Sequence, residues 1–498
     1  RLGLIGKNVV LSLNDQTRIT LPEMLGLSSI DLMETLGKLV VDLKGDAVAK
    51  LVVPEICERL TFMNAVGLGY LTLDRGTSTL SSGEAQRIRL SAQLGSNLSG
   101  VLYVLDEPSI GLHAKDNQRL LDSLERLKSK GNTLLIVEHD EETMRRADRI
   151  IDLGPQAGQS GGHLLTNGTL GTVLKSRKSP TAKFLREGIL HPIRGSRRRL
   201  PSKKPGNRPR RISPEWFGVL GANFRNLNRV NLWMPINRLI GFCGVSGAGK
   251  SSLARSLVKP AVGYAAKVQE KDLSGQELLK LGILPDGLNK KEPIRKILNG
   301  NKFAKVIEVD QSPIGKTPRS TPATYIGAWD RIRLLMSMLP EARTRALPPG
   351  AFSFNVKGGR CESCKGAGKV KLEMNFLPDA YVTCEICNGA RYGEGILDLR
   401  WRGKNVAEIL EFSFSEAAKF FSFDQKLKSL MDLMVETGLG YLSLGQSSPT
   451  LSGGEAQRVK LATELSKRAT GRTLYILDEP TTGLSFFDAH ALMDDTFI

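Results

Sequence analysis

The residues best suited to chemistry form a glycine-rich loop. Residues 244–251 read GVSGAGKS, a full match to the G-x-x-x-x-G-K-[ST] pattern of phosphate-binding loops. The apolar run at 239–243 is expected to form the strand before it, and a helix is expected from Ser252 that ends before Pro260. Backbone N–H groups of such a loop surround phosphates, its lysine pairs with the β- and γ-phosphates, and its last hydroxyl binds Mg²⁺. The predicted ATP-binding residues are Gly244, Val245, Ser246, Gly247, Ala248, Gly249, Lys250, Ser251 and Ser252.

Two apolar runs that read as buried strands each end in an acidic pair. The first is followed by Asp106 and Glu107, and the second by Asp478 and Glu479. An aspartate at the end of a strand can hold Mg²⁺ through water, and the glutamate after it can polarise the attacking water. The strands are expected at residues 101–105 and 474–477.

A histidine, His139, follows a third predicted strand at residues 133–137. A histidine beside the γ-phosphate can sense or position it, although an isolated histidine is more often structural. Its spacing from Asp106 fits a switch in a nucleotide-binding domain, which favours the functional interpretation.

Two segments of nearly the same sequence, LSSGE at 80–84 and LSGGE at 451–455, each open a predicted helix. Serine and glycine amides at a helix N-terminus form an anion site. The residues expected to contact nucleotide are Ser81, Ser82, Gly83, Ser452, Gly453 and Gly454. These signature segments, together with the phosphate loop and the acidic strand ends, are typical of ABC-type ATPases. In that class the signature helix of one half closes over the phosphate loop of the other.

The chain contains an internal repeat. Residues 67–90 and 438–461 are identical at 15 of 24 aligned positions, and the segment at 101–112 recurs at 473–484. A repeat of this size indicates a duplicated module rather than a solenoid.

Four of the six cysteines form two Cys-x-x-Cys pairs in glycine-bearing knuckles. Four thiolates at this spacing can close a tetrahedral Zn²⁺ site of structural type, in a reducing compartment. The alternative is a pair of redox motifs or incidental cysteines. The predicted ligands are Cys361, Cys364, Cys384 and Cys387, and a projecting hairpin is expected between the pairs; Cys57 and Cys243 are expected to be buried core residues.

The net charge is +19, from 70 Lys+Arg against 51 Asp+Glu, and it points to a polyanionic partner such as nucleic acid. A proline-rich segment at 175–211 carries +13 of this excess, so the remainder carries only +6. The segment reads as a flexible linker, and both a solvated spacer and a DNA-binding arm fit its composition. No apolar run approaches the roughly 18 residues of a membrane span.

Beyond these motifs the chain resembles the UvrA family, the DNA-damage-sensing ATPases of bacterial nucleotide excision repair. The resemblance rests on DQSPIGKTPRSTPATYIG at 310–327, the cysteine segment at 352–387, LSGGEAQRVKLA at 451–462 and LDEPTTGL at 477–484. In the first half, LSSGEAQRIRL at 80–90 and VLYVLDEPSIGLHAKDN at 101–117 add to it. Transporter and chromosome-structuring ATPases share the nucleotide motifs but do not resemble the first two segments.

The resemblance implies an α/β fold of two ABC-type nucleotide-binding modules of the P-loop NTPase kind. An inserted α-rich signature domain would carry the zinc module. It also implies that the chain is a central-to-late fragment of a longer protein. The expected domains are the end of signature domain I (1–64), the signature helix and acidic strand of nucleotide-binding domain I (65–170), a basic flexible linker (171–215), the phosphate-loop lobe of nucleotide-binding domain II (216–270), signature domain II with its zinc module (271–450), and the signature helix and acidic strand of domain II (451–498).

Paired as in the family, the halves would make one nearly complete ATP site and one partial site. The first would use the phosphate loop, Gln311, Asp478, Glu479 and the signature residues 81–83. The second would keep Asp106, Glu107, His139 and the signature residues 452–454. Position 82 is serine where the family has glycine, and the added side chain beside a tight turn is expected to loosen the closed state.

The resemblance further implies an ATPase with Mg²⁺ and Zn²⁺ that recognises damaged double-stranded DNA by its distortion and loads a UvrB-like protein. It implies a homodimer of the full-length parent in the bacterial cytoplasm near the nucleoid, without membrane association or nuclease activity of its own. Lys305, Lys316 and Arg319 are predicted phosphate contacts, or else ordinary solvated charges. The alternative function is a UvrA-like paralogue that acts as a nucleotide-gated DNA-binding scaffold with low turnover.

Overall fold

The computed structural model of the chain describes residues 10–12, 18–42, 47–80, 82–94, 98–109, 111–112, 114–155, 161–188, 201, 215–245, 247–285, 292–372, 380–467 and 471–481. The chain divides into two compact units. The first unit comprises residues 1–147 and 241–250, and the second comprises residues 148–240 and 251–498.

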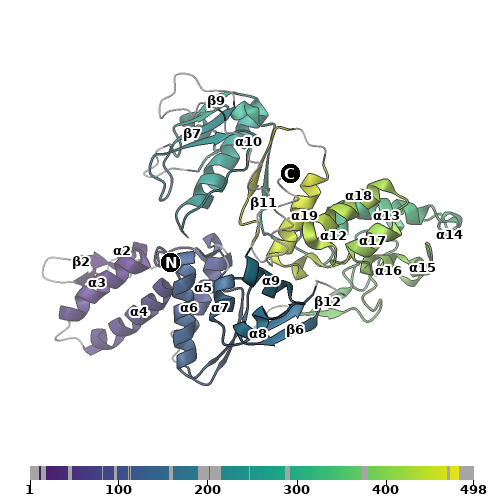
Figure 1. Cartoon of the computed structure of the whole chain (residues 1–498). Coiled ribbons are helices and arrows are strands. Elements are labelled where there is room, and N and C mark those ends of the chain that lie inside the picture. The colour runs from purple at the N-terminus through teal and green to yellow at the C-terminus, as the bar shows by residue number, and fades with distance from the viewer. Residues whose placement is uncertain are drawn as a thin grey trace. The chain divides into compact units, whose positions relative to one another are not determined.

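The first unit begins with a short hairpin and three helices. These elements are β1 (Val10–Ser12), β2 (Arg18–Thr20), α2 (Leu21–Gly26), α3 (Ser29–Asp42) and α4 (Ala47–Ala65). Thr20 and Glu23 form a capping box that starts α2. Helices α3 and α4 run side by side (Figure 1) and bury Leu32 and Leu60 in one small cluster.

The remainder of the first unit packs helices against one face of a pair of parallel strands. Its elements are α5 (Ser82–Leu94), β3 (Leu102–Asp106), α6 (Ala114–Ser129), β4 (Thr133–Val137) and α7 (Glu141–Arg146). Leucines at 120, 124 and 127 lie on one face of α6 because they are spaced by about one helical turn. These leucines pack with Tyr103 of β3 and Leu90 of α5, so the helices cover one face of the strand pair.

In the second unit, an antiparallel pair and two helices come first: β5 (Ile150–Gly154), β6 (His163–Gly168), α8 (Leu170–Leu174) and α9 (Pro180–Glu187). Ser179 caps α9 and also donates a hydrogen bond to Asp152 of β5. The segment at 171–188 is therefore folded, which corrects the expectation of a flexible linker for that part. Most of the rest of the predicted linker, residues 189–200 and 202–214, lies outside the described residues.

A four-stranded antiparallel sheet and a long helix form the next part of the second unit. The strands are β7 (Trp216–Ala222), β8 (Val230–Pro235), β9 (Asp272–Ser274) and β10 (Lys296–Leu298), in the order β8-β7-β10-β9. The helical stretch Ser252–Val258 continues into α10 (Lys259–Val268), and α11 (Gly275–Lys280) follows β9. Leu253 and Leu257 share one core with Val306 and Leu474, which lie on the parallel pair β11 (Lys305–Val309) and β14 (Thr473–Leu477).

Two expectations around the phosphate loop are wrong. Residues 239–243 form no strand in the described structure, because no described strand pairs with them to complete a ladder. The helix does not end before Pro260 either. The turns at Ser252–Val258 are π-helical and run without a break into α10, so Pro260 lies inside one continuous helical stretch where the π-helix changes to α-helix. Cys243 is exposed and Cys57 is half-buried, so neither is the buried core residue that its apolar neighbours indicated.

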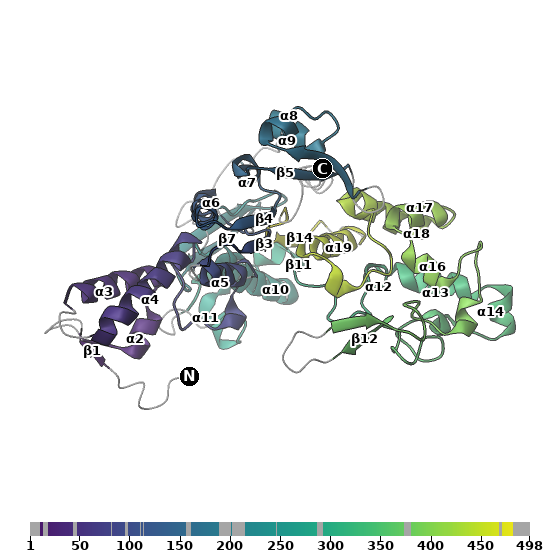
Figure 2. The same ribbon diagram turned by 90° about the horizontal axis from the view of Figure 1, so that it is seen from below.

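The rest of the second unit is rich in helices. It contains α12 (Pro322–Tyr325), α13 (Ala328–Ser337), α14 (Pro340–Thr344), α15 (Glu394–Leu397), α16 (Val406–Glu411), α17 (Phe414–Phe420), α18 (Gln425–Met434) and α19 (Gly453–Leu465). Helices α13, α16, α17 and α18 gather together (Figure 2) around one large core that includes Trp329, Phe414 and Met431. Val459 of α19 packs into the same core, which fixes the signature helix to this domain.

Candidate functional site

The phosphate loop has the backbone that its glycines predict. Gly244, Gly247 and Gly249 have φ angles of 148°, 75° and 96°, in the left-handed region that favours glycine. The Lys250 Nζ donates hydrogen bonds to the carbonyl oxygens of Gly244 (2.7 Å) and Val245 (3.0 Å). The lysine therefore lies over its own loop, and its role toward phosphate stays a prediction. Ser246 lies outside the described residues.

Within the first unit, the phosphate loop lies against the segment that precedes the first signature. A Cβ placed on Gly247 would lie 3.0 Å from ring atoms of Tyr70. The Tyr70 hydroxyl in turn donates a 2.5 Å hydrogen bond to Glu84 on α5, the first signature helix. The loop of the second half is thus adjacent to the signature region of the first half. Ser81 lies outside the described residues, as does the side chain of Ser82.

In the second unit, the parallel pair β11–β14 brings two predicted motifs to one edge. Val309 pairs with Leu477, so Asp310 and Gln311 leave β11 at the edge where Asp478 and Glu479 leave β14. A Cβ placed on Gly453 would lie 3.4 Å from the Cβ of Gln311, so α19 begins beside that glutamine.

The second signature segment uses its side chains as a helix cap. The Ser452 hydroxyl accepts a 3.2 Å hydrogen bond from the Glu455 N–H, and the Ser452 N–H donates to the Glu455 carboxylate at 2.8 Å. Gly453 and Gly454 form the first helical residues of α19, where the N–H groups lack partners within the helix. This terminus therefore keeps the donors that the predicted anion site needs.

The first half shows the arrangement of acid and histidine that the sequence predicts. The His139 Nε2 lies 3.7 Å from Glu107 Oε1, beyond the parallel ends of β3 and β4. Burial raises the pKa of Glu107, and the nearby His139 opposes this effect. Asp106 ends β3, and Gln86 of α5 donates a hydrogen bond to its carbonyl oxygen. The structure thus brings Asp106, Glu107 and His139 together, while their roles toward nucleotide stay predictions.

The four cysteines form a buried cluster. The Sγ atoms of Cys361, Cys364, Cys384 and Cys387 all lie within 4.8 Å of one another. Four thiolates on a tetrahedral Zn²⁺ at about 2.3 Å lie roughly 3.8 Å apart, and the Cys364–Cys387 separation is 3.7 Å. Backbone N–H groups of Cys387 and Ile386 lower the pKa of Cys384 to about 6, whereas burial raises that of Cys387 to about 12. The geometry and the donor set fit zinc.

The cysteine cluster carries the expected hairpin and connects to the nucleotide motifs. β12 (Lys369–Leu372) and β13 (Ala380–Thr383) pair antiparallel, and the tip at 373–379 lies outside the described residues. Arg391, four residues after Cys387, is almost fully buried. It donates hydrogen bonds to Gly445 O (2.8 Å) and Pro318 O (3.5 Å) and lies over the Phe354 ring. One arginine therefore joins the zinc module to segments beside Gln311 and α19.

One of the three predicted DNA-contacting residues already has an acidic partner within the chain. Lys305 forms a 3.5 Å ion pair with Glu464, whereas Lys316 is exposed and Arg319 is half-buried. Neither arrangement assigns a role in DNA binding, which stays a prediction.

Two functional side chains were missed from the sequence, and both lie on the signature helix α19. Gln457 donates hydrogen bonds to Val309 O (3.1 Å) and Asp478 O (2.7 Å), so it joins the ends of β11 and β14. Lys460 binds the Asp310 carboxylate and the Ser312 hydroxyl (2.7 Å). Burial acts to raise the pKa of Asp310, but hydrogen bonds from Lys460 and Ser312 outweigh it and lower the pKa to about 2. The signal for Gln457 was present: Gln86 occupies the equivalent repeat position and makes the same contact to Asp106.

The phosphate loop, the parallel strand pairs that end in acidic residues, and the signature helices define the class as an α/β ABC-type nucleotide-binding fold. No protein-family model matches the chain. The chain is 51% identical to "UvrABC system protein A" of Thermus thermophilus over 446 residues, which are 90% of this chain and 44% of that protein. It is 46% identical to the protein of the same name from Mycobacterium leprae, over 98% of this chain and 47% of that one. The chain is therefore a relative of UvrABC system protein A and spans about half the length of the curated relatives it matches.

The solved structure of UvrA2 from Deinococcus radiodurans has the same fold. It superposes with a TM-score of 0.84 at 37% identity and covers 100% of this chain and 57% of that chain. None of the helices in the described ranges has both the length and the apolar character needed to cross a membrane.

Proposed function

We propose that the chain is the ATP-binding and ATP-hydrolysing part of a UvrA protein that recognises damaged double-stranded DNA and loads a UvrB-like protein. The carrying observation is the edge of the β11–β14 pair, where Asp310–Gln311, Asp478–Glu479 and the signature helix α19 meet. The two strand ends supply the carboxylates and the glutamine that an ABC-type site needs for Mg²⁺ and water, and Gln457 of α19 holds these ends together.

In the proposed site, Lys250 and the loop amides bind the β- and γ-phosphates. Glu479 polarises the attacking water, and Gln311 positions it. Asp478 fits Mg²⁺, because it is a carboxylate at a strand end whose side chain is 36% exposed. Bound Mg²⁺ would neutralise phosphate charge as the γ-phosphoryl group departs. Contact of Gly247 with Tyr70 supports pairing of this loop with the first signature segment.

We further propose that Cys361, Cys364, Cys384 and Cys387 hold a structural Zn²⁺. A closed site of four thiolates leaves no position for substrate, so zinc would fix the hairpin β12–β13 rather than take part in hydrolysis. DNA would bind to the homodimer of the full-length protein, with Lys305, Lys316 and Arg319 contacting phosphates. The higher identity to UvrABC system protein A than to UvrA2 favours the repair subunit over a low-turnover paralogue.

The test is ATP hydrolysis by the purified chain with and without double-stranded DNA that carries a bulky lesion. Lys250→Ala should remove nucleotide binding. Glu479→Gln should retain ATP binding but lower kcat by about 100-fold or more, since water activation is lost. Binding of ATP by Lys250→Ala as tight as by the wild type would refute the placement of the loop.

A further inference from the structure

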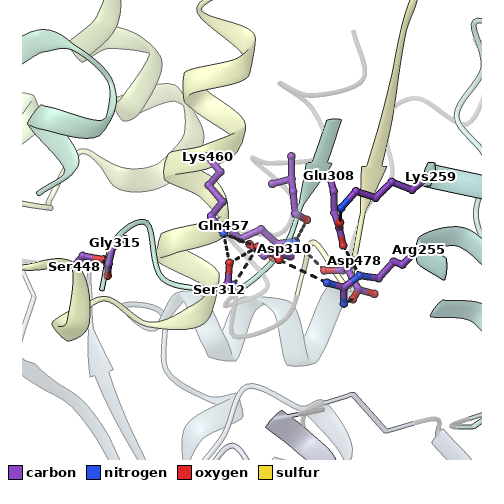
Figure 3. A network of polar contacts seen from close by, with 11 residues as sticks. Arg255, Lys259, Glu308, Asp310, Ser312, Gly315, Ser448, Gln457, Lys460 and Asp478 are labelled. Carbon is purple, nitrogen blue, oxygen red and sulfur yellow. Dashed lines mark hydrogen bonds and ion pairs between the residues drawn. The ribbon is translucent and has the colours of Figure 1, made fainter. Parts of the chain in front are cut away.

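A cluster of opposite charges lies where β11 and β14 end (Figure 3). Its acidic members are Glu308, Asp310 and Asp478, and its basic members are Arg255, Lys259 and Lys460. Lys460 pairs with Asp310 and Lys259 pairs with Glu308. The two lysines come from different helices and each neutralises one carboxylate.

Arg255 differs from the two lysines because it reaches all three carboxylates. Its Nη1 lies 3.0 Å from Asp478 Oδ2, its Nη2 lies 3.6 Å from Asp310 Oδ2, and its Nε pairs with Glu308. Arg255 lies five residues after Lys250, on the helix that follows the phosphate loop. Arg255 and Asp478 are 223 residues apart in the sequence. Their contact joins this helix to the aspartate expected to hold Mg²⁺.

The guanidinium and a divalent cation compete for the same carboxylate. Asp478 is 36% exposed, whereas Glu308 is 10% exposed. Interactions at Glu308 are therefore less screened by water, and Arg255 has a stronger anchor there than at Asp478. A bound Mg²⁺ near Asp478 would repel the guanidinium, and Arg255 can give up Asp478 while keeping its ion pair with Glu308.

We propose that Arg255 is the resident counter-ion of Asp478 and must leave this carboxylate before Asp478 can hold Mg²⁺. Arg255 is thus a positioning residue that sets how much Mg²⁺ the site requires. This inference rests on the proposed function in one respect, namely that Asp478 serves the Mg²⁺ of Mg²⁺–ATP.

The test measures equilibrium binding of a fluorescent ATP analogue to the full chain, titrated with Mg²⁺ and repeated in EDTA. Arg255→Gln should lower the Mg²⁺ concentration at half-saturation by about 3- to 10-fold, because one competing charge is removed. Its affinity for the analogue in EDTA should stay within about twofold of wild type. Lys259→Gln is the matched control: it removes a cation from the same helical stretch that contacts Glu308 but not Asp478, and its Mg²⁺ midpoint should not move.

A double-mutant cycle with Asp478→Asn isolates the pair. In that background, Arg255→Gln should no longer change the Mg²⁺ midpoint. Arg255→Lys, which keeps the charge but not the fork that reaches three carboxylates, should give an intermediate shift and provides a second variant if Arg255→Gln folds poorly.

Three results overturn the proposal in distinguishable ways. Weaker binding of the analogue by Arg255→Gln both in Mg²⁺ and in EDTA would show that Arg255 binds phosphate instead. A wild-type midpoint in Arg255→Gln, while Asp478→Asn raises the midpoint, would refute the counter-ion role and leave the proposed function intact. Absence of Mg²⁺-dependent binding in the wild type would refute both.

Discussion

Replacing Gln457 by methionine tests whether the signature helix holds the ends of β11 and β14 together. Gln457 is only 3% exposed, and its side-chain amide donates to Val309 O and Asp478 O. Methionine has a similar length and is apolar, so it fills the space but leaves both carbonyls without this donor.

The magnitude follows from two lost hydrogen bonds. Each contributes a net ~1 kcal/mol, and a buried acceptor left unpaired costs about 1–3 kcal/mol. The Val309 carbonyl also accepts the Asp478 N–H at 3.4 Å, so the larger penalty falls on Asp478 O. The Gln457 Oε1 has no hydrogen-bond partner among the described residues, and its removal offsets part of the loss. We expect a decrease of about 2–3 kcal/mol in the free energy of unfolding of the second unit.

The assay is urea unfolding followed by tryptophan fluorescence. All four tryptophans, at 216, 233, 329 and 401, lie in the second unit, so the signal reports on that unit alone. Gln425→Met, at an exposed position at the start of α18, is the matched control and should change stability by less than about 0.5 kcal/mol. A decrease for Gln457→Met no larger than that of the control would refute the assigned role of this glutamine.

Two further predictions concern the zinc module and the Asp310 carboxylate. Cys384→Ser should lose the bound zinc, which we expect at about one ion per chain by elemental analysis, while Cys57→Ser should retain it; zinc retained in Cys384→Ser would contradict the four-cysteine site. Lys460→Met should lower the free energy of unfolding at pH 7 by about 1–2 kcal/mol, because the Asp310 carboxylate loses a charged partner. The pKa of Asp310 is lowered to about 2 in the folded chain, so this stabilisation is present above the unfolded pKa near 3.9 and is lost as the pH falls through 2. The difference between wild type and variant should therefore shrink between pH 4 and pH 2 in the same urea assay, and a difference that grew with acid would contradict the assigned pair.

Local patterns of the sequence correctly predicted the elements that carry the motifs. The apolar runs before Asp106, Glu138 and Asp478 form β3, β4 and β14, and both signature segments open helices. Such elements are predictable because the periodicity of buried side chains and the capping residues lie within a few residues of one another. The Cys-x-x-Cys spacing likewise predicted a cluster that the structure brings within 4.8 Å.

The errors arose where a neighbouring segment decides the outcome. The apolar run at 239–243 resembles a strand, but a strand needs a hydrogen-bonding partner, and none of the described strands pairs with it. The proline at 260 resembles a helix stop, but the helix continues through it where the π-helical turns change to α-helix.

The sequence by itself therefore indicated which residues are suited to nucleotide and metal chemistry, because each motif is a short pattern whose chemistry depends on its own spacing. Only the tertiary structure decided which charges meet. Arg255 and Asp478 are 223 residues apart in the sequence. Gln457 joins the ends of β11 and β14, two strands that start 168 residues apart. Those pairings follow from the packing of two helices against β11 and β14, one through Leu253 and Leu257 and the other through Leu461 of α19, and no local pattern along the chain encodes them.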